Sequence, residues 1–141
     1  MTFVLDASIA LAWCFGDQTT PTSETALDRL EHEDARVPGL WSLEIANVLA
    51  LAERRGRLSP AQTSHFLELL GQLPITVDEI ERDATLTTVL ALARSTGLTA
   101  YDASYLALAA ASGVPLATAD AGLRRAAVAV GVDLVGPPEG R

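Results

Sequence analysis

The sequence predicts an α/β fold in three layers, in which helices cover both faces of a mostly parallel central sheet of about four to five short strands. Short apolar runs rich in β-formers alternate along the chain with longer segments of helical periodicity. A hydrophobic content of 49% with 20% charged residues is typical of a globular protein. Because 141 residues without repeats or linkers suit a single core, we expect one domain over residues 1–135 and a loose tail over 136–141.

The first half of the chain is expected to contain two strands and four helices. Ser8 is the predicted N-cap of the first helix, and Thr22 or Ser23 begins the second. Ser59 and Pro60 are typical of a helix start, with serine as the cap and proline in the first position. The predicted strands cover 2–5 and 35–37, and the predicted helices cover 9–15, 23–33, 40–55 and 60–73.

The second half continues this alternation with helices that end at glycine. Gly97 and Gly131 each follow a helical segment, where glycine is favoured because it adopts a left-handed backbone without steric cost. Strands are expected over 74–78, 115–118 and 132–135, and helices over 80–96, 101–112 and 121–130.

The composition excludes several kinds of site. The chain has no lysine, which excludes Schiff-base chemistry and a P-loop. Its single cysteine, Cys14, excludes an internal disulfide and a cysteine-based zinc cluster, and is interpreted as a small buried hydrophobic residue. His32 and His65 lie away from every acidic motif, which disfavours a histidine-based, metal-free mechanism.

The N-terminus, the apolar runs and the net charge bear on the cellular location of the protein and on its ability to bind nucleic acid. The N-terminus has no basic region, and no apolar run approaches the roughly 20 residues that span a bilayer. We therefore expect a cytoplasmic protein that makes no membrane contact. The net charge of −8 argues against an ordinary electrostatic nucleic-acid binder, which would be basic.

Four acidic residues occupy positions where an α/β protein forms a site. Asp6 ends the first strand and Asp120 follows a later one, and the carboxyl ends of parallel strands border the crevice in which ligands bind. Glu44 lies on the apolar stripe of its helix, where an unpaired charge costs several kcal/mol. Asp102 begins on the inward face of its own helix.

Each of these acids also has a purely structural interpretation. Asp6 and Asp120 suit helix N-termini, and Thr99 with Asp102 resembles a capping box. Glu44 would alternatively pair with an arginine or extend its charge to solvent. Taken together, however, four converging carboxylates repel one another without a cation, and an all-oxygen set suits Mg²⁺ or Mn²⁺ rather than zinc.

Four segments, in this order, resemble those of the PIN-domain ribonucleases. They are Asp6-Ala-Ser8 after the first strand, Glu44 with Asn47 in a helix, Tyr101-Asp102-Ala with Tyr105-Leu-Ala-Leu-Ala, and Leu116-Ala-Thr-Ala-Asp120. The resemblance covers residues 2–135. Chain length and motif order look most like the VapC-type toxins of bacterial toxin–antitoxin pairs.

The resemblance implies an endoribonuclease in which the four acids hold one or two Mg²⁺ or Mn²⁺ ions. Ser8 and Thr118 would position carboxylates or water, and Asn47 would be a supporting contact. In this family a metal-activated water attacks the phosphodiester in line and leaves 5′-phosphate and 3′-hydroxyl ends. The implied partners are a tRNA or rRNA substrate, a cognate antitoxin and a second copy of the chain.

Two clusters of arginines are candidate phosphate contacts. They are Arg54, Arg55 and Arg57 at the end of the helix that carries Glu44, and Arg124 with Arg125 one turn past Asp120. The structural alternative is that cations near a helix C-terminus are stabilised by the helix dipole. The apolar helices between Trp41 and Leu70 are candidate surfaces for a homodimer and an antitoxin.

Two other functions stay open at this point. The acids would serve only as caps and solvated charges in a non-catalytic protein-interaction module. An aspartyl phosphatase or phosphoacceptor domain also begins with a strand that ends in aspartate. That second alternative is disfavoured because Ser8 stands where such phosphatases have another acid, and because the chain has no lysine.

Overall fold

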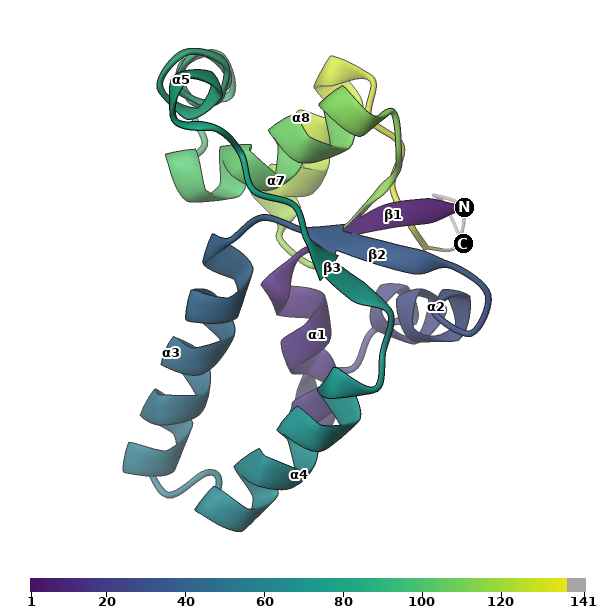
Figure 1. Ribbon diagram of the computed structural model, residues 1–141, viewed down its shortest axis with the longest axis vertical. Helices are drawn as coiled ribbons and strands as arrows, with labels where there is room; N and C mark the ends of the chain where they lie inside the picture. Colours follow the sequence, from purple (N-terminus) through teal and green to yellow (C-terminus); the bar gives the residue numbers. More distant parts are fainter. Residues whose placement is uncertain (137–141) are drawn as a thin grey trace.

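The computed structural model describes residues 1–136, and its centre is a sheet of four parallel strands (Figure 1). The strands lie in the order β3-β2-β1-β4, and each neighbouring pair is parallel. The predicted fold class is therefore confirmed. The strands are β1 (Thr2–Leu5), β2 (Asp34–Val37), β3 (Ile75–Val77) and β4 (Leu116–Ala117).

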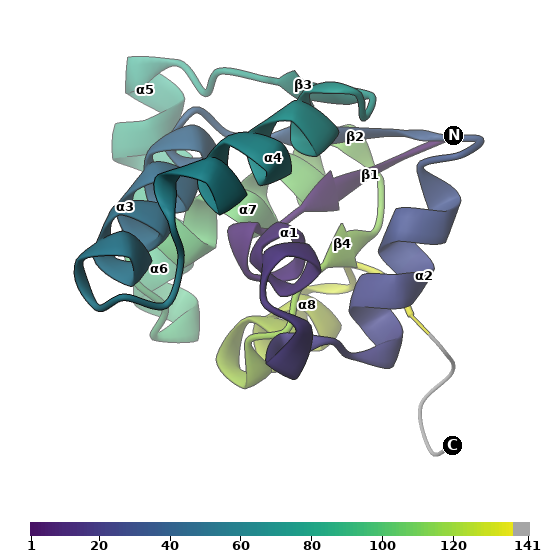
Figure 2. The same ribbon diagram turned by 90° about the horizontal axis from the view of Figure 1, so that it is seen from below.

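Helices cover both faces of this sheet because the strand order reverses at β1. The chain moves outward from β1 through β2 to β3, and then returns to place β4 on the other side of β1. Right-handed crossovers that run in opposite directions along a sheet cover opposite faces. Figure 1 accordingly shows α1 to α4 below the sheet and α7 and α8 above it, and Figure 2 shows α1 in front of β1 and α7 behind it.

The helices follow the strands in an order that matches most of the predicted boundaries. In the first half they are α1 (Ala7–Cys14), α2 (Pro21–Arg29), α3 (Leu40–Arg54) and α4 (Pro60–Gly71), with a 3₁₀ turn at Gly16–Gln18. In the second half they are α5 (Arg82–Ala84), α6 (Leu90–Thr96), α7 (Ala100–Ser112) and α8 (Ala121–Val130).

The core is built around β1 and α7. Phe3, Val4 and Leu5 of β1 are completely buried, as expected for a strand covered on both faces. Seven consecutive residues of α7, 103–109, are also buried, so this helix is enclosed on every side. Three of the seven are alanines, whose small side chains let neighbouring elements approach closely. Asp6 and Asp102 therefore adjoin or belong to deeply buried elements of the core.

Two predicted helix starts are wrong by a few residues. α1 begins at Ala7 with Asp6 in the cap position, and Ser8 lies within the first turn instead of capping it. α2 begins at Pro21, one to two residues earlier than expected, because Thr20 forms a capping box with Ser23. A proline in the first helical position fits this start, since its missing N–H has no partner there in any helix.

The starts and ends that rest on strong local signals are confirmed. Ser59 accepts a hydrogen bond from the backbone N–H of Gln62, whose side chain in turn accepts from the N–H of Ser59. Gly97 and Gly131 end α6 and α8 with φ of 75° and 81°. These positive φ values are the reason that the two positions favour glycine.

The helix expected over 80–96 begins at Arg82 and is not a uniform α-helix. Its middle, Thr85–Val89, is a π-helical segment between α5 and α6. The N–H of Asp78 still donates to the carbonyl of Val37, so strand-like pairing continues past β3 and delays the helix.

The last predicted strand, 132–135, is reduced to a single parallel bridge. Leu134 pairs with Leu116, and the backbone of Leu116 is hydrogen-bonded to Asp133 and Val135. Because β4 has only two residues, it offers a fifth strand little length to pair with. The expected tail, apart from residue 136, lies outside the described residues.

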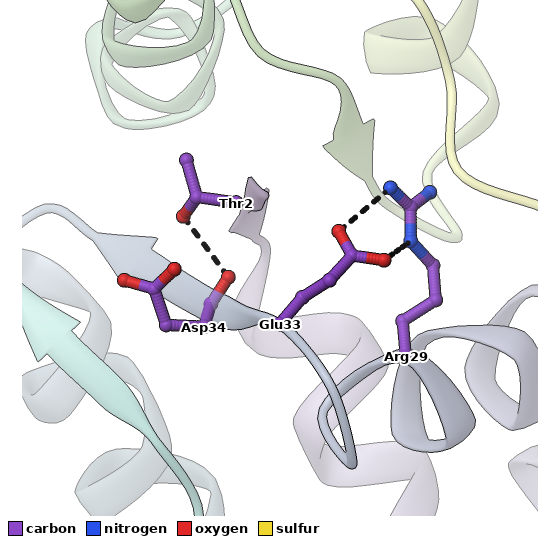
Figure 3. Close-up of polar contacts among 4 residues, drawn as sticks. All are labelled: Thr2, Arg29, Glu33 and Asp34. Carbon is purple, nitrogen blue, oxygen red and sulfur yellow. Dashed lines mark hydrogen bonds and ion pairs between the residues drawn. The ribbon is translucent and has the colours of Figure 1, made fainter.

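Polar contacts fix the exit of α2 against the start of the sheet (Figure 3). The guanidinium of Arg29 donates to both oxygens of Glu33, at 2.8 and 2.9 Å, and holds the pKa of that carboxyl below its ordinary value. Arg29 also lies 5.3 Å from the centre of the Phe3 ring. The hydroxyl of Thr2 donates to the carbonyl of Asp34, which joins β1 to β2.

Two further expectations concern the single cysteine and the membrane-spanning potential of the helices. Cys14 is half-buried, and burial raises the pKa of its thiol, which suits the interpretation as a packed residue. Within residues 1–136, no helix combines the length and the apolar character that crossing a membrane requires.

Candidate active site

The carboxyl ends of β1 and β4 meet where the strand order reverses, and Asp6 lies at this point. Leu5 pairs with Ala117 in the parallel register, so Asp6 and Thr118 are the next residues on their two strands. The N–H of Asp6 donates to the carbonyl of Ala117 at 3.0 Å. Reversal points of open parallel sheets leave a crevice beyond the strand ends, which is where ligands bind in such folds.

Two hydroxyl groups hold the carboxylate of Asp6. Thr118 Oγ1 donates to Asp6 Oδ2 at 2.6 Å, and Ser8 Oγ donates to the same oxygen at 2.7 Å. Both hydroxyls also accept backbone N–H groups, from Asp120 at 3.1 Å and from Ala119 at 3.2 Å. The sequence prediction that Ser8 and Thr118 lie beside the acids agrees with these contacts.

Burial sets the protonation behaviour of Asp6. The residue is 6% exposed, and loss of hydration raises the pKa of its carboxyl above the ordinary value. The hydrogen bonds from Thr118 and Ser8 lower the pKa, but by less than burial raises it. A charged Asp6 is therefore held in an environment that disfavours its charge.

Glu44 lies in α3, half-buried, and its side chain reaches across to α7. The hydroxyl of Tyr105 donates to Glu44 Oε1 at 2.5 Å. Burial raises the pKa of Glu44, the bond from Tyr105 lowers it, and the charges of Asp6 and Asp102 raise it further. An arginine partner, the structural alternative for Glu44, is not found among residues 1–136, where no ion pair of Glu44 occurs.

Sequence reasoning gave Tyr105 no role in the site. The available signal was its spacing, since Tyr105 lies three residues after Asp102 and so shares its helix face. The partner on α3 is 61 residues away in the chain, and no local pattern indicates such a pairing.

Asp102 and Asp120 occupy the first turn of α7 and the cap of α8. The backbone N–H of Asp102 is capped by the Thr99 hydroxyl, as predicted, while its half-buried carboxylate has a pKa raised by burial and then by the charges of Asp6 and Asp120. Asp120 is exposed, and its Oδ2 accepts from the N–H of Leu123 at 2.8 Å. The structural interpretation of Asp120 as an N-cap is therefore confirmed, and it coexists with a position beside the other acids.

The four acids form one electrostatic group. Asp6 acts on the pKa values of both Glu44 and Asp102, and Asp120 acts on that of Asp102. Their donor atoms are all carboxylate oxygens, the ligands that Mg²⁺ and Mn²⁺ prefer, so the chemistry of the set fits such an ion. Within residues 1–136, however, no three acidic, histidine or cysteine side chains are gathered closely enough to share one ion.

The carboxylates are also engaged by hydrogen bonds from their own chain. Asp6 is held by hydroxyls, Glu44 by Tyr105 and Asp120 by the start of α8. Binding one shared ion would therefore require side-chain rearrangement, most of all at Asp120, whose cap bond competes with a metal.

Asn47 lies beside Glu44 on an exposed part of α3. Together with Leu40, Leu43 and Tyr101, the two residues line an open hollow of about 440 Å³. Asn47 follows Glu44 by three residues, so both are on one side of the helix. Asn47 thus lies next to Glu44, and its role as a supporting contact stays a prediction.

The two arginine clusters differ in their distance from the acids. Arg124 donates to the carbonyl of Thr118 at 3.0 Å, and Arg124 and Arg125 line a hollow of about 530 Å³ on α8. Arg54 lies ten residues after Glu44 on the same helix, which corresponds to roughly 15 Å along the axis.

The cluster at the end of α3 also has partners of its own. Arg57 lies 3.9 Å from the carboxylate of Asp17 and 4.9 Å from the centre of the Phe15 ring. Arg54 and Arg55 are exposed at this far end. The structure therefore brings the α8 arginines to the acids and leaves the α3 cluster remote from them.

Comparisons with known proteins agree with the fold and the motifs. A family model described as PIN domain matches residues 3–129. Ribonuclease VapC3 of Pyrobaculum aerophilum is 32% identical over 120 residues, which cover 85% of this chain and 90% of the relative.

Two solved structures share the architecture. The crystal structure of PAE2754 from Pyrobaculum aerophilum is 27% identical, with a TM-score of 0.69, and the match covers 89% of this chain and 84% of that one. The crystal structure of FitAcB from Neisseria gonorrhoeae is 21% identical, with a TM-score of 0.63 and coverage of 96% and 97%, and shares the fold. With the family model covering most of the chain, the protein belongs to the PIN-domain family and resembles the VapC ribonucleases over most of its length.

Proposed function

We propose that this protein is a Mg²⁺- or Mn²⁺-dependent endoribonuclease that hydrolyses RNA phosphodiesters. The observation that carries the proposal is a group of four carboxylates in which Asp102 is repelled by both Asp6 and Asp120, and Glu44 by Asp6 and Asp102. Asp6 and Asp120 follow the carboxyl ends of β1 and β4, and Glu44 and Asp102 come from α3 and α7. The ribonuclease named among the relatives supports the choice of RNA as substrate.

The residues proposed to hold the ion are Asp6, Glu44, Asp102 and Asp120. A divalent cation bound there supplies Lewis-acid activation of water and of the scissile phosphate, and stabilises the leaving oxygen. Asp6 is proposed to contribute a fixed oxygen, because two hydroxyls already hold it in place. Asp102, in the first turn of α7, is proposed to present its half-buried carboxylate to the same ion.

The raised pKa values of Asp6, Glu44 and Asp102 support a cation-binding role. A cation requires the charged form of each carboxylate, whereas burial and mutual repulsion favour the protonated form. Occupancy of the site would therefore release protons, and the affinity for Mn²⁺ should increase with pH.

The test of this proposal is cleavage of labelled RNA by the purified protein. With Mg²⁺ or Mn²⁺ we expect cleavage that EDTA stops and added Mn²⁺ restores. Asp6→Asn and Asp102→Asn should each reduce the rate about 100-fold or more, since each removes a charged ligand. Asp28→Asn, at an exposed position on α2, is the matched control and should cleave as the wild type does. Full activity in Asp6→Asn or Asp102→Asn would contradict the site assignment.

We further propose that the protein is the toxin of a toxin–antitoxin pair that acts in the cytoplasm on tRNA or rRNA. Induced expression of the chain alone should arrest growth, and co-expression of a small partner encoded beside it should relieve the arrest. The Asp102→Asn variant, expressed to the same level, is the control and should leave growth unaffected. Growth that continues with intact, folded wild-type protein would contradict the toxin role.

A homodimer is proposed for the free protein. Trp41, Ile45 and Phe66 are buried, so part of the helical surface predicted for partners belongs to the core. Leu43 and Leu67, by contrast, are 74% and 47% exposed and leave apolar surface on α3 and α4. Light scattering after size exclusion should give twice the mass of the chain.

A further inference from the structure

Tyr105 makes the most unusual polar contact near the four acids. Its side chain is completely buried and its ring belongs to the main hydrophobic core, while its hydroxyl meets Glu44 Oε1 at 2.5 Å. The contact joins the middle of α7 to the first part of α3. Because the ring is fixed by packing on all sides, the donor is in place before anything binds at the site.

We infer that Tyr105 is a positioning residue that fixes the Glu44 carboxylate through Oε1 and leaves Oε2 as the oxygen offered to a divalent cation. This inference rests on the proposed metal-dependent function, and it adds Tyr105 to that site as the residue that positions Glu44. Tyr105 does not touch the ion or the substrate itself; it acts only through Glu44.

The chemistry of the donor suits this task. An arginine in the same place would neutralise Glu44 and compete with a cation, whereas a phenol donates a hydrogen bond and adds no charge. Glu44 accepts no other side-chain hydrogen bond within residues 1–136. Without the Tyr105 hydroxyl, a half-buried carboxylate near two other acids would be free to turn toward solvent.

The placement on α7 couples two acids to one rigid element. Asp102 and Tyr105 are three residues apart and so lie on the same face of the helix. α7 is thus proposed to present one carboxylate directly and to orient a second one, Glu44, that comes from α3. Groups that orient ligating carboxylates typically change metal affinity by about 10- to 100-fold when they are removed.

The test is a titration of the full-length protein with Mn²⁺ alone. Calorimetry measures the heat of binding, and the electron spin resonance signal measures the free ion. Tyr105→Phe keeps the ring and removes only the hydroxyl oxygen. We expect it to weaken Mn²⁺ binding about 10-fold, and to lower kcat on RNA while KM changes little. In a Glu44→Gln background, the same substitution should produce no further loss.

The matched control is Ser112→Ala, which removes a hydroxyl from the far end of the same helix and should bind Mn²⁺ as the wild type does. Circular dichroism and thermal melting establish that Tyr105→Phe is folded. Mn²⁺ affinity equal to that of the wild type in Tyr105→Phe, or additive losses in the double variant, would overturn the inference. If Tyr105→Phe weakens Mn²⁺ binding but the wild type cleaves no RNA, the proposed function fails and the positioning role stands.

Discussion

Asp6 is a residue whose surroundings oppose its own charge. Hydrogen bonds from the hydroxyls of Thr118 and Ser8 and from backbone N–H groups at the start of α1 favour the charged form of Asp6. Burial nevertheless outweighs them and raises the pKa. A site of this kind stores unfavourable free energy in the metal-free protein, and a bound cation would relieve it.

This balance predicts the effect of neutralising Asp6 on stability. The folded state binds the Asp6 proton more tightly than the unfolded chain, so the contribution of Asp6 to stability is present below its ordinary pKa of 3.8 and is lost as the pH rises through the raised value. In EDTA at pH 7, Asp6→Asn should therefore raise the melting temperature by about 3 °C, and the gain should shrink as the pH falls. Calorimetry between pH 5 and pH 8 measures the difference. Asp28→Asn should show no such gain, and a lower melting temperature for Asp6→Asn at pH 7 would contradict the account.

Thr118 allows a second prediction at the same scale. Its side chain is fully buried and its hydroxyl both donates to Asp6 and accepts the N–H of Asp120. Thr118→Val keeps the shape but removes one of the two hydroxyl donors to Asp6 and the acceptor for the N–H of Asp120, which should cost about 1–3 kcal/mol in urea unfolding. Thr118→Ser restores the hydroxyl and should recover most of the loss. Equal stability of the valine variant and the wild type would show that the contact contributes nothing.

The helices show which local signals in a sequence suffice to place an element. Ser59 with Pro60, Gly97 and Gly131 each fix a boundary through backbone chemistry that involves only neighbouring residues, and these predictions are confirmed. The start of α2 was placed too late because Thr20 and Thr22 are both good caps, and only the capping box with Ser23 decides between them.

Other elements depend on pairing that the local sequence does not contain. The segment 132–135 has the composition of a strand, yet it forms one bridge because its neighbour β4 has only two residues. The π-helical segment at Thr85–Val89 packs against α7, as α6 does, and no residue pattern predicts it.

The cap of α4 gives a prediction at the scale of the element. Ser59→Ala removes the acceptor for the N–H of Gln62 and should lower the free energy of unfolding by about 1 kcal/mol. Ser64→Ala, at an exposed position inside the same helix, is the control and should change it little or raise it slightly, since alanine favours helix. Both values come from urea unfolding followed by circular dichroism. If both variants behave alike, the capping box does not stabilise α4.

At the scale of the whole molecule, the strand order explains why these four acids are neighbours. The sequence predicted each acid and a parallel sheet, but not the order β3-β2-β1-β4 that places β4 beside β1. Sequence patterns describe single elements, whereas strand order depends on crossovers between distant parts of the chain. The contact between Tyr105 and Glu44 was unpredictable for the same reason.

The distribution of arginines over the molecule leads to a prediction about RNA binding. The chain carries a net charge of −8, so any attraction for phosphates must be local. Arg125 lies on α8, the helix that Asp120 caps, whereas Arg54 lies at the far end of α3. In an Asp102→Asn background with Mg²⁺, Arg125→Ala should weaken RNA binding about threefold. The slope of the logarithm of the binding constant against the logarithm of the salt concentration should become shallower by about one.

Arg54→Ala is the matched control, because it removes the same charge from an exposed helix position. Fluorescence anisotropy at several salt concentrations measures both variants. Equal weakening by Arg54→Ala and Arg125→Ala would mean that RNA responds to overall charge and not to the α8 surface.

The hydrogen bond between Asp6 and Thr118 also determines how early during synthesis the proposed site can form. The two residues are separated by 112 positions in the chain. At about 5–20 residues per second, a ribosome needs about 6 to 22 s to add Thr118 after Asp6. Throughout that interval the nascent chain carries Asp6 without its neighbouring strand, so the proposed site cannot assemble during synthesis. A partner that binds as the chain leaves the ribosome would therefore meet the protein before its first opportunity to cut RNA.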